Sequence, residues 1–272
     1  MKILALVLCV ALVLAHMLAR ADLDQGLEAA KRGDFATAFE EWRPLAEKGH
    51  TKAQFNLAIM YFHGQGLPQD RKEAFIWFLK AAEQGDAEAQ YMLGMMCKEG
   101  EGVPENSREA VKWLRKAAEQ GYPAAQNNLG GMYSKGQGVP QDYQEAVKWF
   151  RKSAAQGNAY AQFNLGFAYA KGDGLPQDYT DAVKWLRKAA EQGYPVAQND
   201  LGVMYSEGQG VPQDYVQAYV WFNLAAASND VESQDIARKN REVLAIKMTK
   251  EQIARAQQLS SVWKPAGKSK GD

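Results

Sequence analysis

The amino-acid sequence predicts an all-α fold, a right-handed α-solenoid of antiparallel helix pairs with a 36-residue repeat. Three series of residues recur at this interval along most of the chain. The series are Trp77, Trp113, Trp149, Trp185 and Trp221; Gly64, Gly100, Gly136, Gly172 and Gly208; and Pro68, Pro104, Pro140, Pro176 and Pro212. A fixed period of this length is typical of stacked helical units that bury their apolar faces against one another.

The first helix of each unit is clearest in the repeat at residues 122–157. Pro123 suits the first turn of a helix, where its missing N–H leaves no hydrogen bond unmade. Ala125, Leu129 and Tyr133 follow at intervals of four, which places them on one face of a helix. We expect this face to pack in the core.

A glycine-proline loop and a second helix complete the same unit. Gly136 allows the backbone angles that end a helix, and Pro140 keeps the chain extended. Asp142 is a helix-capping residue, and Glu145 three positions later predicts a capping box. Gly157 stands where a left-handed residue commonly follows a helix. Each unit is therefore predicted to be a helical hairpin.

The repeats divide the chain into segments. Five units are expected over residues 50–229, preceded at 22–49 by an N-terminal helical hairpin in which the pattern is worn. Residues 230–263 predict capping helices, with Thr249 and Gln252 at the start of the last one. The tail at 264–272 is short and polar and is predicted to be disordered.

The first 21 residues predict a secretory signal peptide. Lys2 gives a positive start, Ile3 to Leu14 is almost wholly apolar, and Ala19-Arg20-Ala21 resembles a cleavage site before Asp22. We therefore expect a periplasmic or secreted protein without stable membrane insertion. An uncleaved anchor is the alternative, but the apolar run is short for a bilayer.

The charges and rare residues exclude several functions. The sequence has 32 basic and 32 acidic residues, so nucleic acid is not expected as a partner. Beyond residue 21 the only histidines are His50 and His63 and the only cysteine is Cys97. No catalytic residues, metal ligands or cofactor are predicted, and Ser261 with Lys264 matches a β-lactam-reactive S-x-x-K motif without its partner motifs.

The segment from Ala125 to Trp149 resembles the Sel1-like repeat family, a relative of tetratricopeptide repeats. The shared pattern is A-x-x-x-L-G-x-x-Y-x-x-G-x-G-V-P-Q-D-x-x-x-A-x-x-W. The resemblance covers about 180 residues and implies an adaptor for protein–protein contacts. It links exported members to envelope assembly, cell-wall metabolism, signalling and host interaction. Some exported relatives bind or hydrolyse β-lactams, but those carry cysteine pairs that this chain lacks.

The resemblance also implies a ligand-binding groove, because the first helices of tetratricopeptide-like arrays line a concave face. On the flank of those helices the repeats differ from one another. The predicted groove residues are Asn56, Tyr91, Asn127, Asn128, Phe163, Asn164, Phe167 and Asn199. Asn amides both donate and accept hydrogen bonds, so a row of them can bind a peptide backbone. In the alternative interpretation the aromatic residues belong to the core and the Asn side chains are only solvated.

Three functions remain open from the sequence. The favoured one is an exported scaffold that binds a protein or peptide in the cell envelope. The second is a binder of carbohydrate or peptidoglycan fragments in the same groove. The third, disfavoured because no catalytic motif is complete, is an enzyme acting on β-lactams or cell-wall amides.

Overall fold

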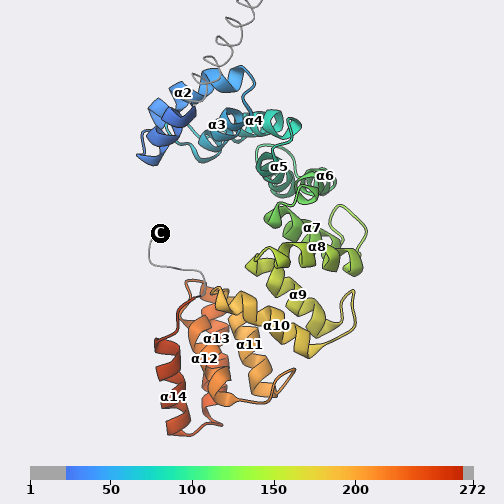
Figure 1. The fold of residues 1–272 in the computed structure, drawn as a ribbon, viewed down its shortest axis with the longest axis vertical. Coiled ribbons are helices and arrows are strands. Elements are labelled where there is room, and N and C mark those ends of the chain that lie inside the picture. The colour runs from blue at the N-terminus through green and yellow to red at the C-terminus, as the bar shows by residue number, and fades with distance from the viewer. Residues whose placement is uncertain (1–22, 266–272) are drawn as a thin grey trace, which may run out of the picture. The chain divides into compact units, whose positions relative to one another are not determined.

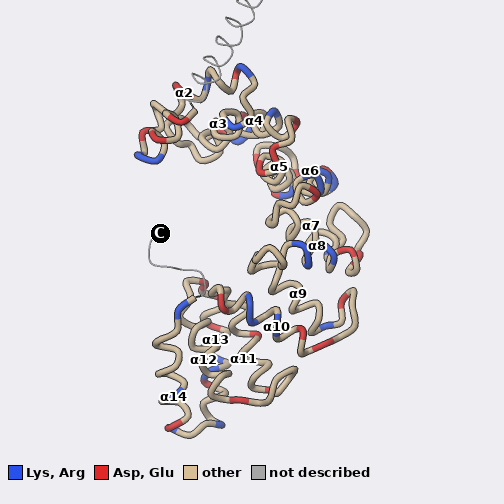
Figure 2. Tube along the Cα trace, viewed as in Figure 1, with Lys and Arg blue, Asp and Glu red and all other residues tan. Residues whose placement is uncertain are grey.

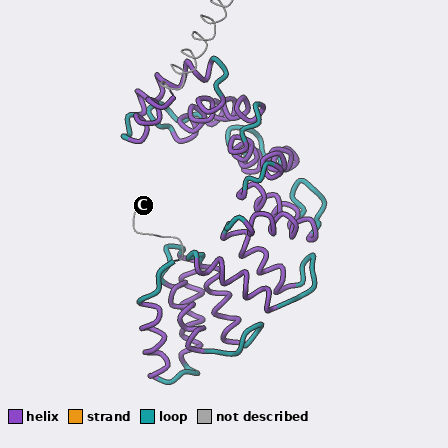
Figure 3. The backbone as a smooth tube through the Cα atoms, viewed as in Figure 1, coloured by secondary structure: helices purple, strands orange, loops and turns teal. Residues whose placement is uncertain are grey.

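The computed structural model describes residues 23–265, and every regular element in that range is a helix (Figures 1 and 3). Residues 23–31 are helical. The further helices are α2 (Phe35–Glu47), α3 (Thr51–His63), α4 (Arg71–Glu83), α5 (Ala87–Glu99), α6 (Ser107–Glu119), α7 (Pro123–Lys135), α8 (Tyr143–Ala155), α9 (Ala159–Lys171), α10 (Tyr179–Glu191), α11 (Pro195–Glu207), α12 (Tyr215–Ala226), α13 (Val231–Ala245) and α14 (Lys250–Ser261). The predicted signal peptide and residues 266–272 of the predicted tail lie outside the described residues.

The helices follow one another as antiparallel pairs, which confirms the predicted all-α fold of 36-residue hairpins. The chain separates into two compact units, residues 1–125 and 126–272. In the first unit α3 packs on α4 and α5 on α6. In the second unit α9 packs on α10 and α11 on α12, and α12 also contacts both α13 and α14.

Glycines make the close approaches within and between hairpins. Gly130 of α7 lies against Phe150 of α8, and a Cβ at residue 130 would stand 2.7 Å from that ring. Gly174, in the loop after α9, has φ +75°, and a Cβ there would overlap the backbone of Tyr143. The second glycine of the loop is therefore required both by its left-handed angle and by its contact with the preceding hairpin.

Asp and Asn cap the second helices as predicted, but the capping boxes are only half formed. Asp142 accepts a hydrogen bond from the backbone N–H of Glu145 at 2.9 Å. The Glu145 carboxylate instead pairs with Lys148 at 2.8 Å, one helical turn along. The predicted full box at Asp142 is wrong, because the Asp142 backbone N–H that Glu145 would accept donates instead to the Tyr133 carbonyl oxygen at 3.0 Å. Thr249 and Gln252 do make both bonds.

Buried glutamines join consecutive hairpins. Gln162 is only 5% exposed, and its amide donates to the carbonyl oxygen of Ala154 near the end of α8. Its side-chain oxygen accepts a 2.8 Å hydrogen bond from Gln192. The same arrangement recurs at Gln54 and Gln90 in the first unit. Each of these helix-end carbonyls also accepts from the backbone N–H of the glycine three residues later, so the glutamine gives it a second donor from the next hairpin.

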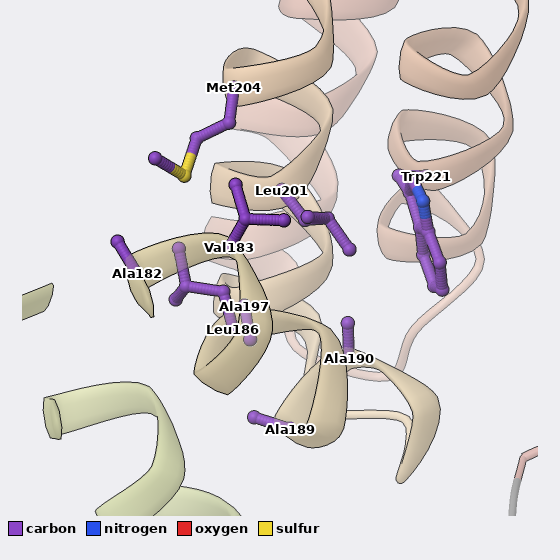
Figure 4. Close-up of a cluster of buried hydrophobic side chains, with 9 residues drawn as sticks. All are labelled: Ala182, Val183, Leu186, Ala189, Ala190, Ala197, Leu201, Met204 and Trp221. Atoms are coloured by element: carbon purple, nitrogen blue, oxygen red, sulfur yellow. The ribbon is translucent and has the colours of Figure 1, made fainter. Parts of the chain in front are cut away.

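The apolar core is made of clusters that each join neighbouring helices. Figure 4 shows one cluster in which Leu186 of α10, Leu201 of α11 and Trp221 of α12 pack together. Trp149 and Trp221 are 6% and 8% exposed. Trp113 is likewise buried, whereas Trp77 and Trp185 are half-buried, so three of the five repeated tryptophans belong fully to the core.

The two ends of the described chain depart from the repeat. Before the first full hairpin, Asp34 caps α2, and the Trp42 indole N–H donates to the carbonyl oxygen of Leu23 at 3.2 Å. After the last hairpin, α13 lies against α11 as well as α12. The helix α13 thus occupies the position that the first helix of another repeat would take.

Candidate functional site

The open face of the first helices is defined here as the side carrying Asn127 in α7, Asn164 in α9, Asn199 in α11 and Asn240 in α13. These side chains connect neighbouring first helices. Asn164 Nδ2 donates to Asn127 Oδ1 at 2.9 Å, and Asn240 Nδ2 donates to Asn199 Oδ1 at 2.8 Å. The second unit therefore carries two amide pairs on this face.

A cavity of about 420 Å³ adjoins the first amide pair and is called the first notch. Its apolar wall includes Val147 and Phe150 of α8 with Phe163 and Phe167 of α9. Asn164 also lines it, so the cavity combines apolar rings with an amide. Lys135 at the end of α7 and Asp173 in the loop after α9 add one charge of each sign to its lining.

A strip of aromatic rings extends from the first notch. The ring centroids of Phe167 and Phe163 lie 6.2 Å apart. Those of Phe163 and Tyr194, just before α11, lie 5.3 Å apart. Tyr194 in turn lies 5.0 Å from Tyr160. Phe167 and Tyr160 are 43% and 57% exposed. The strip therefore offers aromatic surface to a ligand at the edge of an apolar cavity.

The structure brings together four of the sequence-predicted residues, Asn127, Phe163, Asn164 and Phe167. Asn128 is half-buried on α7 and makes contacts of its own. Asn56 and Tyr91 belong to the first unit. Both are half-buried, and Tyr91 lies 5.2 Å from Tyr122.

Asn199 lies in a different environment from the other predicted asparagines. It is 9% exposed, because α13 lies over it and Asn240 bonds its side-chain oxygen. Asn199 also lines a cavity of about 200 Å³ with Ser233 and Ile236 of α13, and its role in ligand binding stays a prediction. Burial also raises the pKa of the neighbouring carboxyl, Asp200, and the Asn199 amide and Lys171 oppose this rise.

Sequence reasoning missed Asn240 as a partner on this face. The period of 36 residues from Asn164 and Asp200 leads to Ile236, and Asn240 stands four residues later. An i, i+4 step keeps a side chain on the same helical face, so the missed signal was a shift of one turn.

The histidines and the cysteine have structural surroundings. The ring of His50 accepts from the Ala53 backbone N–H at the start of α3, and His63 lies 5.1 Å from the ring of Phe62. Cys97 is 3% exposed, and burial raises the pKa of its thiol. Across residues 23–265, no three His, Cys, Asp or Glu side chains are grouped to hold a metal ion.

A family model described as the Sel1 repeat matches five consecutive segments, residues 51–86, 87–122, 123–158, 159–194 and 195–230. The chain belongs to the Sel1 repeat family. Sel1 repeats are generally protein-interaction modules on a scaffold that is typically not catalytic. In the described part of this Sel1 repeat protein, no helix is long and apolar enough to cross a membrane.

Solved structures support the assignment. A Sel1 repeat protein from Oxalobacter formigenes is 30% identical with a TM-score of 0.76, and the match covers 88% of this chain and 98% of that one. The protective antigen c5321 of uropathogenic Escherichia coli, described as displaying an SLR fold, is 32% identical with a TM-score of 0.59. That match covers 90% of this chain and 60% of the antigen.

Curated relatives match over short segments only. A 50-residue segment, 18% of this chain, is 48% identical to an exopolysaccharide production negative regulator of Rhizobium leguminosarum bv. viciae and covers 19% of it. A 49-residue segment, also 18% of this chain, is 39% identical to the rat DAP3-binding cell death enhancer 1 and covers 10% of it. Such partial matches concern the repeat and not the activities of those whole proteins.

Proposed function

We propose that this Sel1 repeat protein binds an extended peptide segment of a partner protein at the first notch. The observation that carries this proposal is the amide pair of Asn127 and Asn164 beside an apolar cavity lined by Phe163 and Phe167. A peptide offers both kinds of group that this arrangement complements, backbone amides and an apolar side chain.

The amide pair retains hydrogen-bonding capacity for a ligand. Asn164 uses one N–H on Asn127, which leaves the Asn127 NH₂ group and the Asn164 oxygen without a partner among the described residues. The NH₂ group can donate to a peptide carbonyl, and the oxygen can accept from a peptide N–H. The pair thus suits the alternation of donors and acceptors along an extended backbone.

The cavity provides the apolar part of the binding free energy. Complete burial of a Leu or Phe side chain contributes about 1.5–3 kcal/mol relative to exposure. The first notch, at about 420 Å³, has room for such a side chain between Val147 and Phe167. Because a few buried anchors dominate most interfaces, a peptide with one large apolar residue should bind here.

We further propose that binding takes place in the cell envelope or outside the cell. The signal-peptide pattern of residues 1–21 supports export, with cleavage before Asp22. Fusing residues 1–30 to alkaline phosphatase tests this directly. Export requires phosphatase activity and loss of the leader, and a fusion retained in the cytoplasm would contradict it.

The binding proposal is tested by selecting ligands from a displayed library of random 12-residue peptides and measuring affinity by fluorescence anisotropy. Phe167→Ala and Asn164→Ala should each weaken the selected peptides at least about tenfold. Met95→Ala is the matched control, because residue 95 is the equivalent of residue 167 two repeats earlier. Unchanged affinity in both notch variants would exclude this site.

A second candidate is a carbohydrate or peptidoglycan-fragment binder, which the exposed rings of Tyr160 and Phe167 favour. Sugar rings stack on exposed aromatic faces through their C–H groups. An oligomer of N-acetylglucosamine is the probe. Saturable binding that is lost in Tyr160→Ala, with no peptide selected from the library, would favour this function instead.

A further inference from the structure

We propose that α13 is a ligand-binding helix as well as a cap, and that a second notch between α11 and α13 binds a second apolar side chain of the same extended peptide. This inference rests on the proposed peptide binding at the first notch. It concerns residues beyond the five matched repeats, which end at residue 230.

The helix α13 repeats the polar geometry of α9. The 2.8 Å bond from Asn240 to Asn199 reproduces the 2.9 Å bond from Asn164 to Asn127, with donor and acceptor in the same order. The acceptors are 72 residues apart, whereas the donors are 76 apart. The helix has therefore shifted by about one turn and kept the amide pair.

The second notch is built like the first. It measures about 250 Å³ and is lined by Ser206, Phe222 and Val243, among others. Ser206 and Phe222 are the equivalents of Ser134 and Phe150, which line the first notch. In the second notch Val243 takes the place of Phe167, three residues after the asparagine that donates the amide bond. We expect the second notch to prefer Leu or Val over an aromatic side chain.

The outer side of α13 is more apolar than a cap alone requires. The terminal repeat of an array needs a polar outer surface to remain soluble. Val243 is 61% exposed, next to the second notch, and Ile246 one turn further is 85% exposed. A peptide bound in the second notch would cover Val243, which lines that notch, and so would remove one of these apolar side chains from solvent.

The charges around the two notches specify the chemistry of the partner. The first notch has Lys135 on the α7 side and Asp173 after α9, and the second has Glu207 on the α11 side and Lys247 after α13. Within residues 23–265, none of these four forms an ion pair. At the first notch the complementary peptide carries an acidic residue, an apolar anchor and a basic residue, in that order. At the second notch the order of charges is reversed: a basic residue, an apolar anchor and an acidic residue.

The spacing of the two anchors follows from helix geometry. Neighbouring packed helices stand roughly 10 Å apart, and two such steps separate the notches, or roughly 20 Å. An extended chain advances about 3.3 Å per residue, so the anchors should be about six residues apart. The peptide EFKGSGKLE has this spacing and this order of charges.

The test compares fluorescein-labelled EFKGSGKLE with EFKGSGKAE and EAKGSGKLE by anisotropy. We expect the two-anchor peptide to bind at least about tenfold more tightly than either single-anchor peptide, because the second contact is intramolecular. Val243→Ser should remove this gain. Ile246→Ser, at the C-cap of α13 and outside the notch, should retain it.

A charge exchange gives an independent measurement. Glu207→Lys should weaken EFKGSGKLE, and a peptide with Glu in place of the second Lys should bind this variant better than the original peptide does. Equal affinity of the one-anchor and two-anchor peptides for the wild-type chain would overturn the second notch alone. Failure of every peptide, including EFKGSGKAE, would overturn the first notch and with it both proposals.

Discussion

Two adjacent glycines on α7 lie on different sides of the helix. Gly130 lies on the seam, the buried surface along which helices pack together, and Gly131 lies on the open face. A Cβ added at Gly130 would stand 2.7 Å from the ring of Phe150. A Cβ added at Gly131 would meet no atom within 4 Å. The residues equivalent to Gly131 are Ile59, Met95, Phe167 and Val203. The residues equivalent to Gly130 are Ala58, Gly94, Gly166 and Gly202, so this position takes only a small residue, whereas the position of Gly131 takes side chains of any size.

The two faces also differ in their hydrogen bonds. On the seam, Gln162 donates to Ala154 and accepts from Gln192, so both its NH₂ group and its oxygen bond the scaffold. On the open face, Asn127 and Asn164 bond each other once and keep donors and an acceptor for another molecule. A side-chain amide thus holds hairpins together in one place and is available to a ligand in the other.

Figure 2 shows acidic and basic residues interspersed along the same helices.

The largest effect should come from Gly174→Ala, which breaks a contact between hairpins. The left-handed φ of +75° costs about 1–2 kcal/mol for a non-glycine residue, and overlap with the Tyr143 backbone adds to this. We expect a loss of about 3 kcal/mol in the free energy of unfolding, measured by urea titration.

Gly157→Ala is the matched control for that substitution. Its φ of +91° is similarly unfavourable, but no atom lies within 4 Å of the added Cβ. A loss of only about 1–2 kcal/mol is expected. Equal losses at residues 157 and 174 would show that the contact with Tyr143 contributes nothing.

The adjacent glycines of α7 give the next effect, with opposite signs. Gly130→Ala should destabilise the protein by about 1–3 kcal/mol, since Phe150 must move to admit a methyl group. Gly131→Ala should stabilise it by about 0.5–1 kcal/mol, since alanine is the better helix former and space is open. Urea titration of both variants measures the pair. A destabilised Gly131→Ala would contradict an open face at this residue.

The smallest effect concerns the partly buried carboxyl of Asp200 on α11. Burial raises the pKa of Asp200, so the folded state binds the proton more tightly than the unfolded state. The contribution of Asp200 to stability is therefore greatest at low pH and falls as pH rises from about 3.8 through the higher folded pKa.

Asp200→Asn should remove this pH dependence. The free energy of unfolding of the variant, minus that of the wild type, should therefore be larger at pH 7 than at pH 4. Urea titrations at both pH values measure the difference. Asp235→Asn on α13 is the control, because this carboxylate is exposed and pairs only with Arg238. If the two variants changed in parallel with pH, the burial of Asp200 would not be the cause.

Much of the scaffold could be predicted from residues one at a time. Pro at the start of a helix, Asp at its cap and Gly at a left-handed position act through the local backbone, so their spacing located the hairpins. The capping box at Asp142 failed because the carbonyl oxygen of Tyr133, in the preceding helix, competes for the Asp142 backbone N–H. Competition of this kind is not visible in a two-residue motif.

The candidate site was predictable only in part. The sequence placed Asn164, Phe163 and Phe167 on the same flank of a first helix, and all three line the first notch. The helical period alone is enough for this grouping. The period could not show that Asn199 is covered, because α13 enters the array four residues out of step.

The sequence by itself determined the repeat, the family and the residues that face away from the seam. These follow from a period of 36 residues and from local rules of helix starts, turns and caps. The tertiary structure alone decided which of those residues meet: the first notch needs side chains from α7, α8 and α9, and the second needs α11, α12 and α13. Cavities and amide pairs form between helices, and their geometry depends on packing distances that no single segment encodes.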